Sequence, residues 1–265
     1  MLFHKIHNWR YYFPTLQQSG YHPVEGVVDD SIWRKGSFEI VSSDAVRFRV
    51  DCCHLKCSTA IDSNLGTAIL TDTTIETAET IRSFLALATN APLPLRPSCA
   101  GIPELLAFVA KWGAPSLRQP LWAALESAVR RRTVWAPWAF QAAAFGDNAG
   151  LCSLVLRTEA HNVWAEGVGT GTPGESVWDP AHWPPAFRAT PTPYLCALER
   201  AWESAARKGG LESIADVEQI AGEFERFLRI ARSACEYQSG EGLPQRWLCM
   251  CTTTLKRSLA CRLKY

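Results

Sequence analysis

The sequence predicts a mixed α+β fold, in which strands come early in the chain and helices occupy the rest. Apolar residues alternate with charged ones from Val46 to Asp51, which is the pattern of a strand with one buried face. From residue 74 onward, apolar residues recur every three or four positions, as on one face of a helix. With 265 residues, of which 47% are hydrophobic, the chain can bury a sizeable core.

Residues 38–61 are expected to form a strand, a tight turn, a second strand and a helix. The first strand begins at Phe38, and residues 42–44 favour a turn because short polar side chains hydrogen-bond to their own backbone. The second strand covers residues 46–50. After Asp51, which is a suitable helix N-cap, the apolar period becomes helical.

Residues 1–34 are expected to form an irregular arm, because prolines and glycines interrupt a segment with many aromatic side chains. Two interpretations are open for these aromatic side chains. The arm docks on its own domain, or it contacts a second chain. The candidate interaction residues of the arm are Trp9, Tyr11, Tyr12 and Phe13.

A short strand at residues 67–71 is expected to precede a helix over residues 74–89, with Thr73 and Glu76 as its capping box. Three prolines end this helix and mark a connection. Residues 166–191, which are rich in Gly, Pro and Trp, are expected to form a long loop. Further helices are expected at residues 102–112, 117–132, 137–145, 151–160, 194–207, 214–235 and 246–263.

Three segments occur in an order that matches a known family: FEIVSSDAVRF, IRSFLALATNAPLPL and LLAFVAKWGAPSLRQPL. After the first segment begins, Phe48, Val50, Asp51, Leu55 and Thr59 fall on the pattern F-x-V-H-x-x-x-L-x-x-x-S, with Asp51 at the usual His and Thr59 at the usual Ser. Together these features resemble the BTB/POZ fold, and more specifically the divergent BTB proteins of basidiomycete fungi.

The resemblance implies a BTB/POZ-like domain over residues 35–132, built as a small mixed sheet capped by helices. A mainly α-helical extension would follow over residues 133–265. Residues expected in the core are Phe48, Val50, Leu55, Phe84 and Trp112. The chain departs from the family at positions that shape the charged pocket and the dimer surface of its members: Asp51, Thr59, Asp62 and Ala88.

The same resemblance implies a non-enzymatic protein that binds other proteins, either as an oligomerisation module or as a substrate adaptor of a ubiquitin ligase. Its expected partner is a second copy of the chain or a cullin-type scaffold. The net charge of +1 provides no overall attraction to nucleic acid or to an anionic membrane. We expect a cytoplasmic or nuclear location, because the sequence has no signal peptide and no apolar run of membrane-spanning length.

The alternative is an enzyme that binds a nucleotide or another small molecule through the glycine-rich loop at residues 167–174. Residues 169–174 match G-x-G-x-x-G, but this motif needs a preceding strand and a following helix to hold a pyrophosphate. Neither is expected here. We therefore expect no catalytic residue and no cofactor.

The ten cysteines are expected to be mostly buried free thiols. Cys249 and Cys251 form one C-x-C pair without a second close pair, which zinc sites require, so no metal is expected. Cys53 and Cys57 fall on the apolar face of the helix expected after Asp51, which favours core packing.

Overall fold

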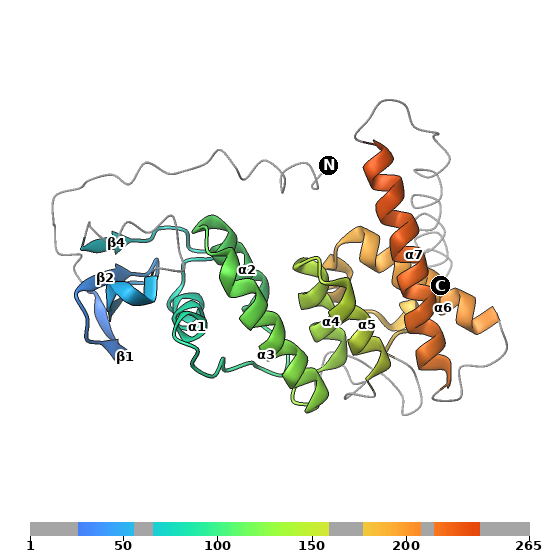
Figure 1. The fold of residues 1–265 in the computed structure, drawn as a ribbon, viewed down its shortest axis with the longest axis horizontal. Helices are drawn as coiled ribbons and strands as arrows, with labels where there is room; N and C mark the ends of the chain where they lie inside the picture. The colour runs from blue at the N-terminus through green and yellow to red at the C-terminus, as the bar shows by residue number, and fades with distance from the viewer. Residues whose placement is uncertain (1–25, 56–65, 159–176, 208–214, 239–265) are drawn as a thin grey trace, which may run out of the picture. The chain divides into compact units, whose positions relative to one another are not determined.

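The computed structural model describes residues 26–55, 66–158, 177–207 and 215–238 (Figure 1). The chain divides into two compact units. The N-terminal unit comprises residues 1–96 and 100–125, and the C-terminal unit comprises residues 97–99 and 126–265. The division in the chain between residues 125 and 126 falls within helix α3 (Arg118–Arg130).

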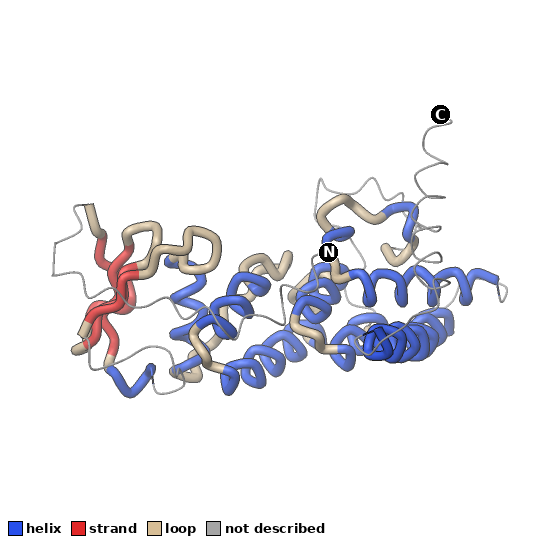
Figure 2. The backbone as a smooth tube through the Cα atoms, turned by 90° about the horizontal axis from the view of Figure 1, so that it is seen from above, coloured by secondary structure: helices blue, strands red, loops and turns tan. Residues whose placement is uncertain are grey.

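The N-terminal unit contains a four-stranded mixed sheet in the order β1-β3-β2-β4. Its strands are β1 (Val28–Arg34), β2 (Phe38–Val41), β3 (Val46–Val50) and β4 (Thr67–Ile69). Strands β2 and β3 form an antiparallel hairpin, while β1 runs parallel to β3 and β4 runs parallel to β2. The predicted hairpin and the predicted short strand are therefore confirmed, and Figure 2 shows the strands side by side in one layer.

Strand β1 corrects the prediction that all of residues 1–34 are irregular. In β1 only Asp30 is buried, so the strand lacks the apolar alternation that would reveal it in the sequence. Gly36 then connects β1 to β2 in close contact with β3. Its φ is 147°, and a Cβ atom at this position would lie 2.1 Å from the carbonyl carbon of Val50. Only glycine fits this connection.

The two faces of the sheet differ in chemistry. Phe38, Ile40 and Phe48 lie on the buried face and are at most 1% exposed. On the other face, Arg49 lies 3.1 Å from Glu39 as an ion pair. The alternation of apolar and charged residues in β3 is thus the alternation between these two faces.

Helix α1 (Ala78–Ala88) begins later than the sequence predicts. Its N-cap is Thr77, whose hydroxyl accepts a hydrogen bond from the Thr80 amide at 3.4 Å. The hairpin turn contributes a second cap, since the Asp44 carboxylate accepts from the Ala78 amide at 2.8 Å. The predicted capping box of Thr73 and Glu76 is wrong, because the N-cap is Thr77 and the Glu76 carboxylate accepts from the amides of Thr71 and Asp72.

Glu76 is 1% exposed, and both of its carboxylate oxygens are hydrogen-bonded. Oε2 accepts from the amides of Thr71 and Asp72 at 2.8 and 2.7 Å. Oε1 accepts from the Trp112 indole N–H at 3.1 Å and lies 2.8 Å from the Lys111 ammonium. A buried carboxylate needs such partners, because an unpaired charge is costly to remove from water.

The backbone of Glu76 extends these contacts to the hairpin. The Ser43 amide and hydroxyl both donate to the Glu76 carbonyl, at 2.9 and 3.0 Å. Within the turn, the Ser42 hydroxyl accepts from the Val46 amide at 2.9 Å, which confirms that polar side chains stabilise the turn. Glu76 therefore joins the hairpin turn, the segment before α1 and the end of helix α2 (Ile102–Lys111).

The segment after β3 forms a short 3-10 helix, η3 (Cys52–Leu55), within the described residues. Leu55 is 2% exposed, whereas Cys53 is exposed to solvent. The prediction that Cys53 packs in the core is therefore wrong. Cys57 and residues 59–61 of the predicted helix lie outside the described residues.

The later helices follow the predicted order. They are α2 (Ile102–Lys111), α3, α4 (Ala136–Phe145), α5 (Ala149–Arg157), α6 (Thr192–Arg207) and α7 (Ala215–Gln238). A 3-10 turn, η5 (Pro115–Leu117), leads into α3. Gly113 has a φ of 60° just after α2, in the left-handed region that glycine adopts readily at a helix end. The predicted helix at residues 246–263 lies outside the described residues.

The core of the C-terminal unit is centred on Phe140 of α4. Its ring centroid lies 5.8 Å from that of Trp178, 6.1 Å from that of Phe187 and 5.3 Å from that of Phe224 in α7. The described part of the predicted loop, residues 177–191, contains two 3-10 turns, η6 (Pro180–His182) and η7 (Phe187–Ala189). Its aromatic residues are thus core residues of this unit.

Replacing Glu76 by alanine is expected to lower the free energy of unfolding of the N-terminal unit by about 3 kcal/mol, because the indole, two amides and an ammonium lose their acceptor. Glu79→Ala is the control, since Glu79 is exposed and pairs with Arg96 on the surface at 2.9 Å. The Glu79→Ala variant should lose less than about 1 kcal/mol of the free energy of unfolding. Urea unfolding followed by circular dichroism measures both, and equal losses would contradict the role assigned to Glu76.

Candidate interaction surface

Strand β1 presents the most exposed large apolar side chains among the described residues. Ile32 is 74% exposed and Val28 is 65% exposed. Beside them Trp33 is half-buried, and its ring meets that of His54 edge-on with centroids 6.2 Å apart. We refer to Val28, Ile32 and Trp33 as the β1 patch. The patch lies at the edge of the sheet, since β1 is its first strand.

The backbone of the β1 patch is held by Asp30, which is 1% exposed. Its Oδ1 accepts hydrogen bonds from the amides of Ile32 and Trp33, at 2.8 and 2.9 Å. Its Oδ2 accepts from Nε of Arg82 in α1, at 2.6 Å. The Asp30 carbonyl also accepts from Nε of Arg34, at 2.9 Å. A single buried carboxylate thus fixes the patch to helix α1.

The Asp30 contacts determine whether a partner can bind by adding a strand next to β1. The pairing of β1 with β3 is irregular between Asp29 and Arg34, which is the position of the Asp30 turn. The amides of Ile32 and Trp33 already donate to Asp30, so they are not available to an added strand. Edge irregularities of this kind oppose strand addition. A partner would therefore bind the patch through side chains.

The hydrogen bonds at Asp30 also affect its ionisation. Burial raises the pKa of this carboxyl, but the amides of Trp33 and Ile32 and the Arg82 guanidinium outweigh it, and the pKa lies below its ordinary value. The charged form is therefore the stable form in the folded unit, and Arg82 is its counter-ion. The same guanidinium lies 5.9 Å from the centre of the Phe48 ring.

Helix α1 does not add an apolar surface to the β1 patch. Its large apolar residues are buried at 4% exposure or less: Ile81, Phe84, Leu85 and Leu87. The side chains that it leaves accessible are polar, among them Glu79 and Arg82. The exposed apolar side chains described in this part of the unit therefore lie on β1 rather than on α1.

All five residues expected in the core are buried. Their exposures are 0% for Phe48, 1% for Val50, 2% for Leu55, 0% for Phe84 and 7% for Trp112. Asp51 is exposed and Ala88 is half-buried. The expected interaction residues lie outside the described residues, namely Trp9, Tyr11, Tyr12 and Phe13, as do Thr59 and Asp62.

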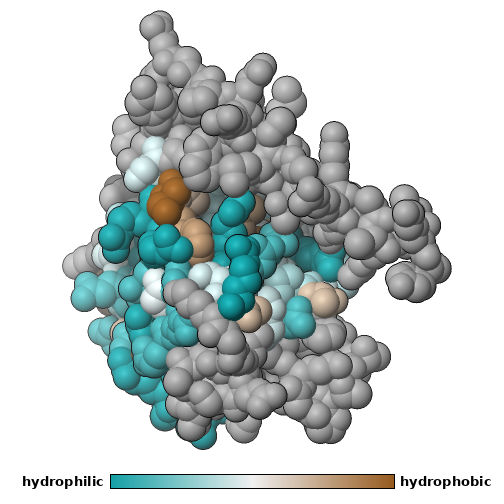
Figure 3. Space-filling view, turned by 90° about the vertical axis from the view of Figure 1, so that its right-hand side faces the viewer, coloured by the Kyte–Doolittle hydropathy of each residue, from teal (hydrophilic) through white to brown (hydrophobic). Residues whose placement is uncertain are grey.

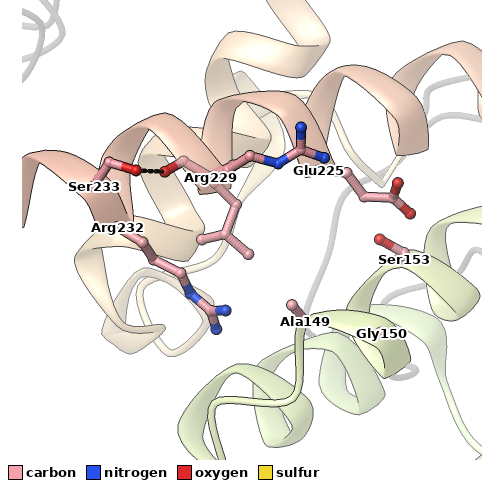
Figure 4. Close-up of a pocket in the computed structure, with 8 residues that line it drawn as sticks. Ala149, Gly150, Ser153, Glu225, Arg229, Arg232 and Ser233 are labelled. Carbon is pink, nitrogen blue, oxygen red and sulfur yellow. Dashed lines mark hydrogen bonds between the residues drawn. The ribbon is translucent and has the colours of Figure 1, made fainter.

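The C-terminal unit has a groove of about 450 Å³ between α5 and α7 (Figure 4). Small residues of α5 line one side, and Leu228 and longer polar residues of α7 line the other. The lining residues are Ala149, Gly150, Ser153, Glu225, Leu228, Arg229, Arg232 and Ser233.

One end of the groove is a hydrogen-bonded trio. The Tyr194 hydroxyl donates to Oδ1 of Asp147 at 2.7 Å, and Nη2 of Arg232 donates to that hydroxyl at 2.6 Å. The Asp147 carboxylate also accepts from Arg232. Burial and this carboxylate raise the pKa of Tyr194 well above its ordinary value, so the hydroxyl remains a donor.

The other end of the groove is also paired internally. In Figure 4 the Ser153 hydroxyl faces the Glu225 carboxylate, and Arg157 lies 2.9 Å from that carboxylate as an ion pair. The Ser153 hydroxyl lowers the pKa of Glu225, burial opposes this, and Arg157 lowers it further, so the carboxyl remains charged. These contacts tie α5 to α7. Both carboxylates at the groove have partners from the protein itself.

The described cysteines are a mixture of buried and accessible thiols. Burial raises the pKa of Cys99 to about 12 and raises that of Cys152 well above its ordinary value. Both thiols therefore stay protonated at neutral pH and are poor nucleophiles. Within the described ranges no group of three or more His, Cys, Asp or Glu is placed to hold a metal ion. Cys249, Cys251 and the glycine-rich loop at residues 167–174 fall outside these ranges.

No helix in the described part of the chain is long and apolar enough to span a membrane. Comparison of the chain with protein-family models, with curated proteins and with solved structures found no match in any of the three.

Asp30→Asn tests the anchor of the patch through pH. Because the pKa of Asp30 is lowered on folding, its contribution to stability is present above the unfolded pKa of about 4 and is lost as the pH falls through the folded pKa. We expect the variant to be less stable than the wild type at pH 7 and to lose less stability on acidification.

The control for this test is Asp29→Asn, because the Asp29 side chain is half exposed and its nearest cation, Arg47, is 3.7 Å away. Its stability at pH 7 should stay within about 0.5 kcal/mol of the wild type. Urea unfolding at pH 3 to pH 7, in steps of about one pH unit, measures the free energy of unfolding of all three proteins. If the free energy of unfolding of Asp30→Asn changes with pH as that of the wild type does, Asp30 does not anchor the patch in its charged form.

Proposed function

We propose that the N-terminal unit is a non-enzymatic module that binds another protein through the β1 patch. The observation that carries the proposal is the exposure of two large aliphatic side chains on one short strand, 74% for Ile32 and 65% for Val28. Apolar side chains grouped on a surface and rimmed by polar residues are typical of protein-binding sites. Asp29, Ser31 and Arg34 of the same strand are exposed polar residues.

The rigidity of the patch supports the same proposal. Asp30 holds the amides of Ile32 and Trp33, and Arg82 holds Asp30 from helix α1. A surface whose backbone is already ordered loses less conformational entropy on binding than a mobile loop. Trp33 adds an aromatic side chain of the type that often dominates the energy of an interface.

The order of elements supports a BTB-like identity for this unit. A strand hairpin, a short helix, a third strand parallel to the first, helix α1 and helix α2 occur in the order on which the family resemblance is based. The aromatic residues of the arm, such as Trp9 and Phe13, precede β1 in the sequence. We propose that they extend the surface of the β1 patch when a partner binds.

A second copy of the chain is the partner that we propose first, and the protein would then act as an oligomerisation module in the cytoplasm or nucleus. The adaptor role, in which a cullin-type scaffold is bound, follows from the same resemblance. The oligomerisation role and the adaptor role both need a surface that recognises protein side chains. Neither requires a catalytic group or a cofactor.

Ile32→Lys is expected to abolish self-association, because it places a charge in the centre of the apolar patch. Ile69→Lys is the matched control, since Ile69 is also exposed, at 46%, but lies on strand β4 at the other edge of the sheet. Light scattering over a range of protein concentrations measures the mass of the particle. The wild type and Ile69→Lys should give a dimer, and Ile32→Lys a monomer.

A wild type that is monomeric at all concentrations would reject the second copy as partner. A cullin scaffold would then be tested by pull-down beside a known BTB adaptor as positive control. If Ile32→Lys and the wild type behave alike in both experiments, the β1 patch is not the binding surface.

A further inference from the structure

The groove between α5 and α7 has unused hydrogen-bond donors at one end. Ala149 and Gly150 are the first residues of α5, and the first amides of a helix have no acceptor within it. Asn148 serves the next two amides, since its side chain accepts from Leu151 at 3.0 Å and its carbonyl from Cys152 at 3.1 Å. Among the described residues, the amides of Ala149 and Gly150 have no acceptor. They remain able to donate to a bound group.

Two arginines of α7 add donors to the groove. Within the described residues, Arg232 makes its hydrogen bonds to Asp147 and Tyr194 through Nη2, so Nε and Nη1 can donate elsewhere. In Figure 4 this guanidinium points toward Ala149, at the start of α5. Arg229 also lines the groove and forms no ion pair with the described part of the chain. Guanidinium groups and a helix N-terminus both attract an anion.

A buried hydroxyl at the other end of the groove lacks a partner. Ser153 is 2% exposed, and its Oγ has no hydrogen-bond partner in the described ranges. It lies one turn after Ala149 on the same side of α5. In Figure 4 it faces Glu225 across the groove, and no hydrogen bond joins the two groups. Buried polar groups normally have partners, so this hydroxyl indicates a bound group that supplies one.

We propose that the groove binds a small phosphate ester that also carries hydroxyl groups, such as a sugar phosphate. The phosphate lies at the start of α5, where the free amides and the N–H groups of Arg229 and Arg232 donate to its oxygens. The ligand hydroxyls lie between Ser153 and Glu225. Because Glu225 already pairs with Arg157 at 2.9 Å, a neutral hydroxyl suits it better than a second cation.

The size and the lining of the groove fit such a ligand. Its volume of about 450 Å³ lies in the range of small-molecule sites. Leu228 offers an apolar contact for the carbon skeleton. Gly150 keeps the wall open, because a Cβ atom there would meet only Oδ1 of Asn148, at 3.7 Å. Figure 3 shows a face of the molecule on which the described residues are mostly hydrophilic, with one small hydrophobic area.

Calorimetric titration of the full-length chain with glucose phosphate and with glycerol phosphate tests the site. Both esters should bind, and glucose and glycerol without phosphate should not. Inorganic phosphate should bind about tenfold more weakly than the esters, because it lacks the hydroxyls that reach Ser153 and Glu225.

Arg229→Gln should weaken the binding of both esters about tenfold or more, because it removes charge-assisted hydrogen bonds to the phosphate. Arg226→Gln is the matched control. It removes the same charge from the same helix, but Arg226 pairs with Glu223 at 2.7 Å and does not line the groove. This variant should bind the esters like the wild type.

Two further variants separate binding from folding. Gly150→Leu should abolish binding, because its side chain fills the groove, while α5 still forms because leucine has a higher helix propensity than glycine. Ser153→Ala should weaken binding without lowering the free energy of unfolding, because the hydroxyl has no hydrogen bond to lose. Circular dichroism during urea unfolding measures the stability of both variants.

Failure of both esters to bind the wild type would overturn the proposal, as would an unchanged affinity in Gly150→Leu. Equal affinities for inorganic phosphate and for the esters would overturn the hydroxyl contacts of Ser153 and Glu225. The outcome is independent of the β1 patch, which belongs to the other unit.

Discussion

The structure of the N-terminal unit depends on the burial of one carboxylate, that of Glu76. With 1% of its surface exposed, this residue bonds two amides before α1, the indole N–H of Trp112 and the ammonium of Lys111. Its own carbonyl accepts from Ser43 in the hairpin turn. Burying a charge is favourable only when such a set of partners is complete, so these segments must adopt their positions together.

The position of α1 connects this network to the surface. The hairpin turn caps α1 through Asp44, and α1 carries Arg82, which holds Asp30 beneath the β1 patch. At the edge of the sheet a second carboxylate, that of Asp30, is also buried and paired, and it is the least exposed residue of β1. Buried polar contacts fix where the exposed Ile32 lies. In the C-terminal unit, by contrast, aromatic packing around Phe140 determines the arrangement.

Periodicity in the sequence is sufficient to predict the hairpin and the helices, because the apolar residues of each lie on one face. It fails for β1, in which the single buried residue is the polar Asp30. It also misassigns Glu76, because a glutamate three residues after a threonine has the spacing of a capping box, while its partner Trp112 is 36 residues away. Partners that are distant in sequence leave no local pattern, and the exposed patch could not be predicted for the same reason.

A double-mutant cycle between Glu76 and Trp112 tests the dependence of the unit on this carboxylate most directly. Glu76→Ala, Trp112→Phe and the double variant are compared with the wild type by urea unfolding. If the two side chains stabilise the unit through each other, the double variant should be more stable than the sum of the single losses predicts, by about 1 kcal/mol or more. Losses that add within about 0.3 kcal/mol would contradict the central role of Glu76.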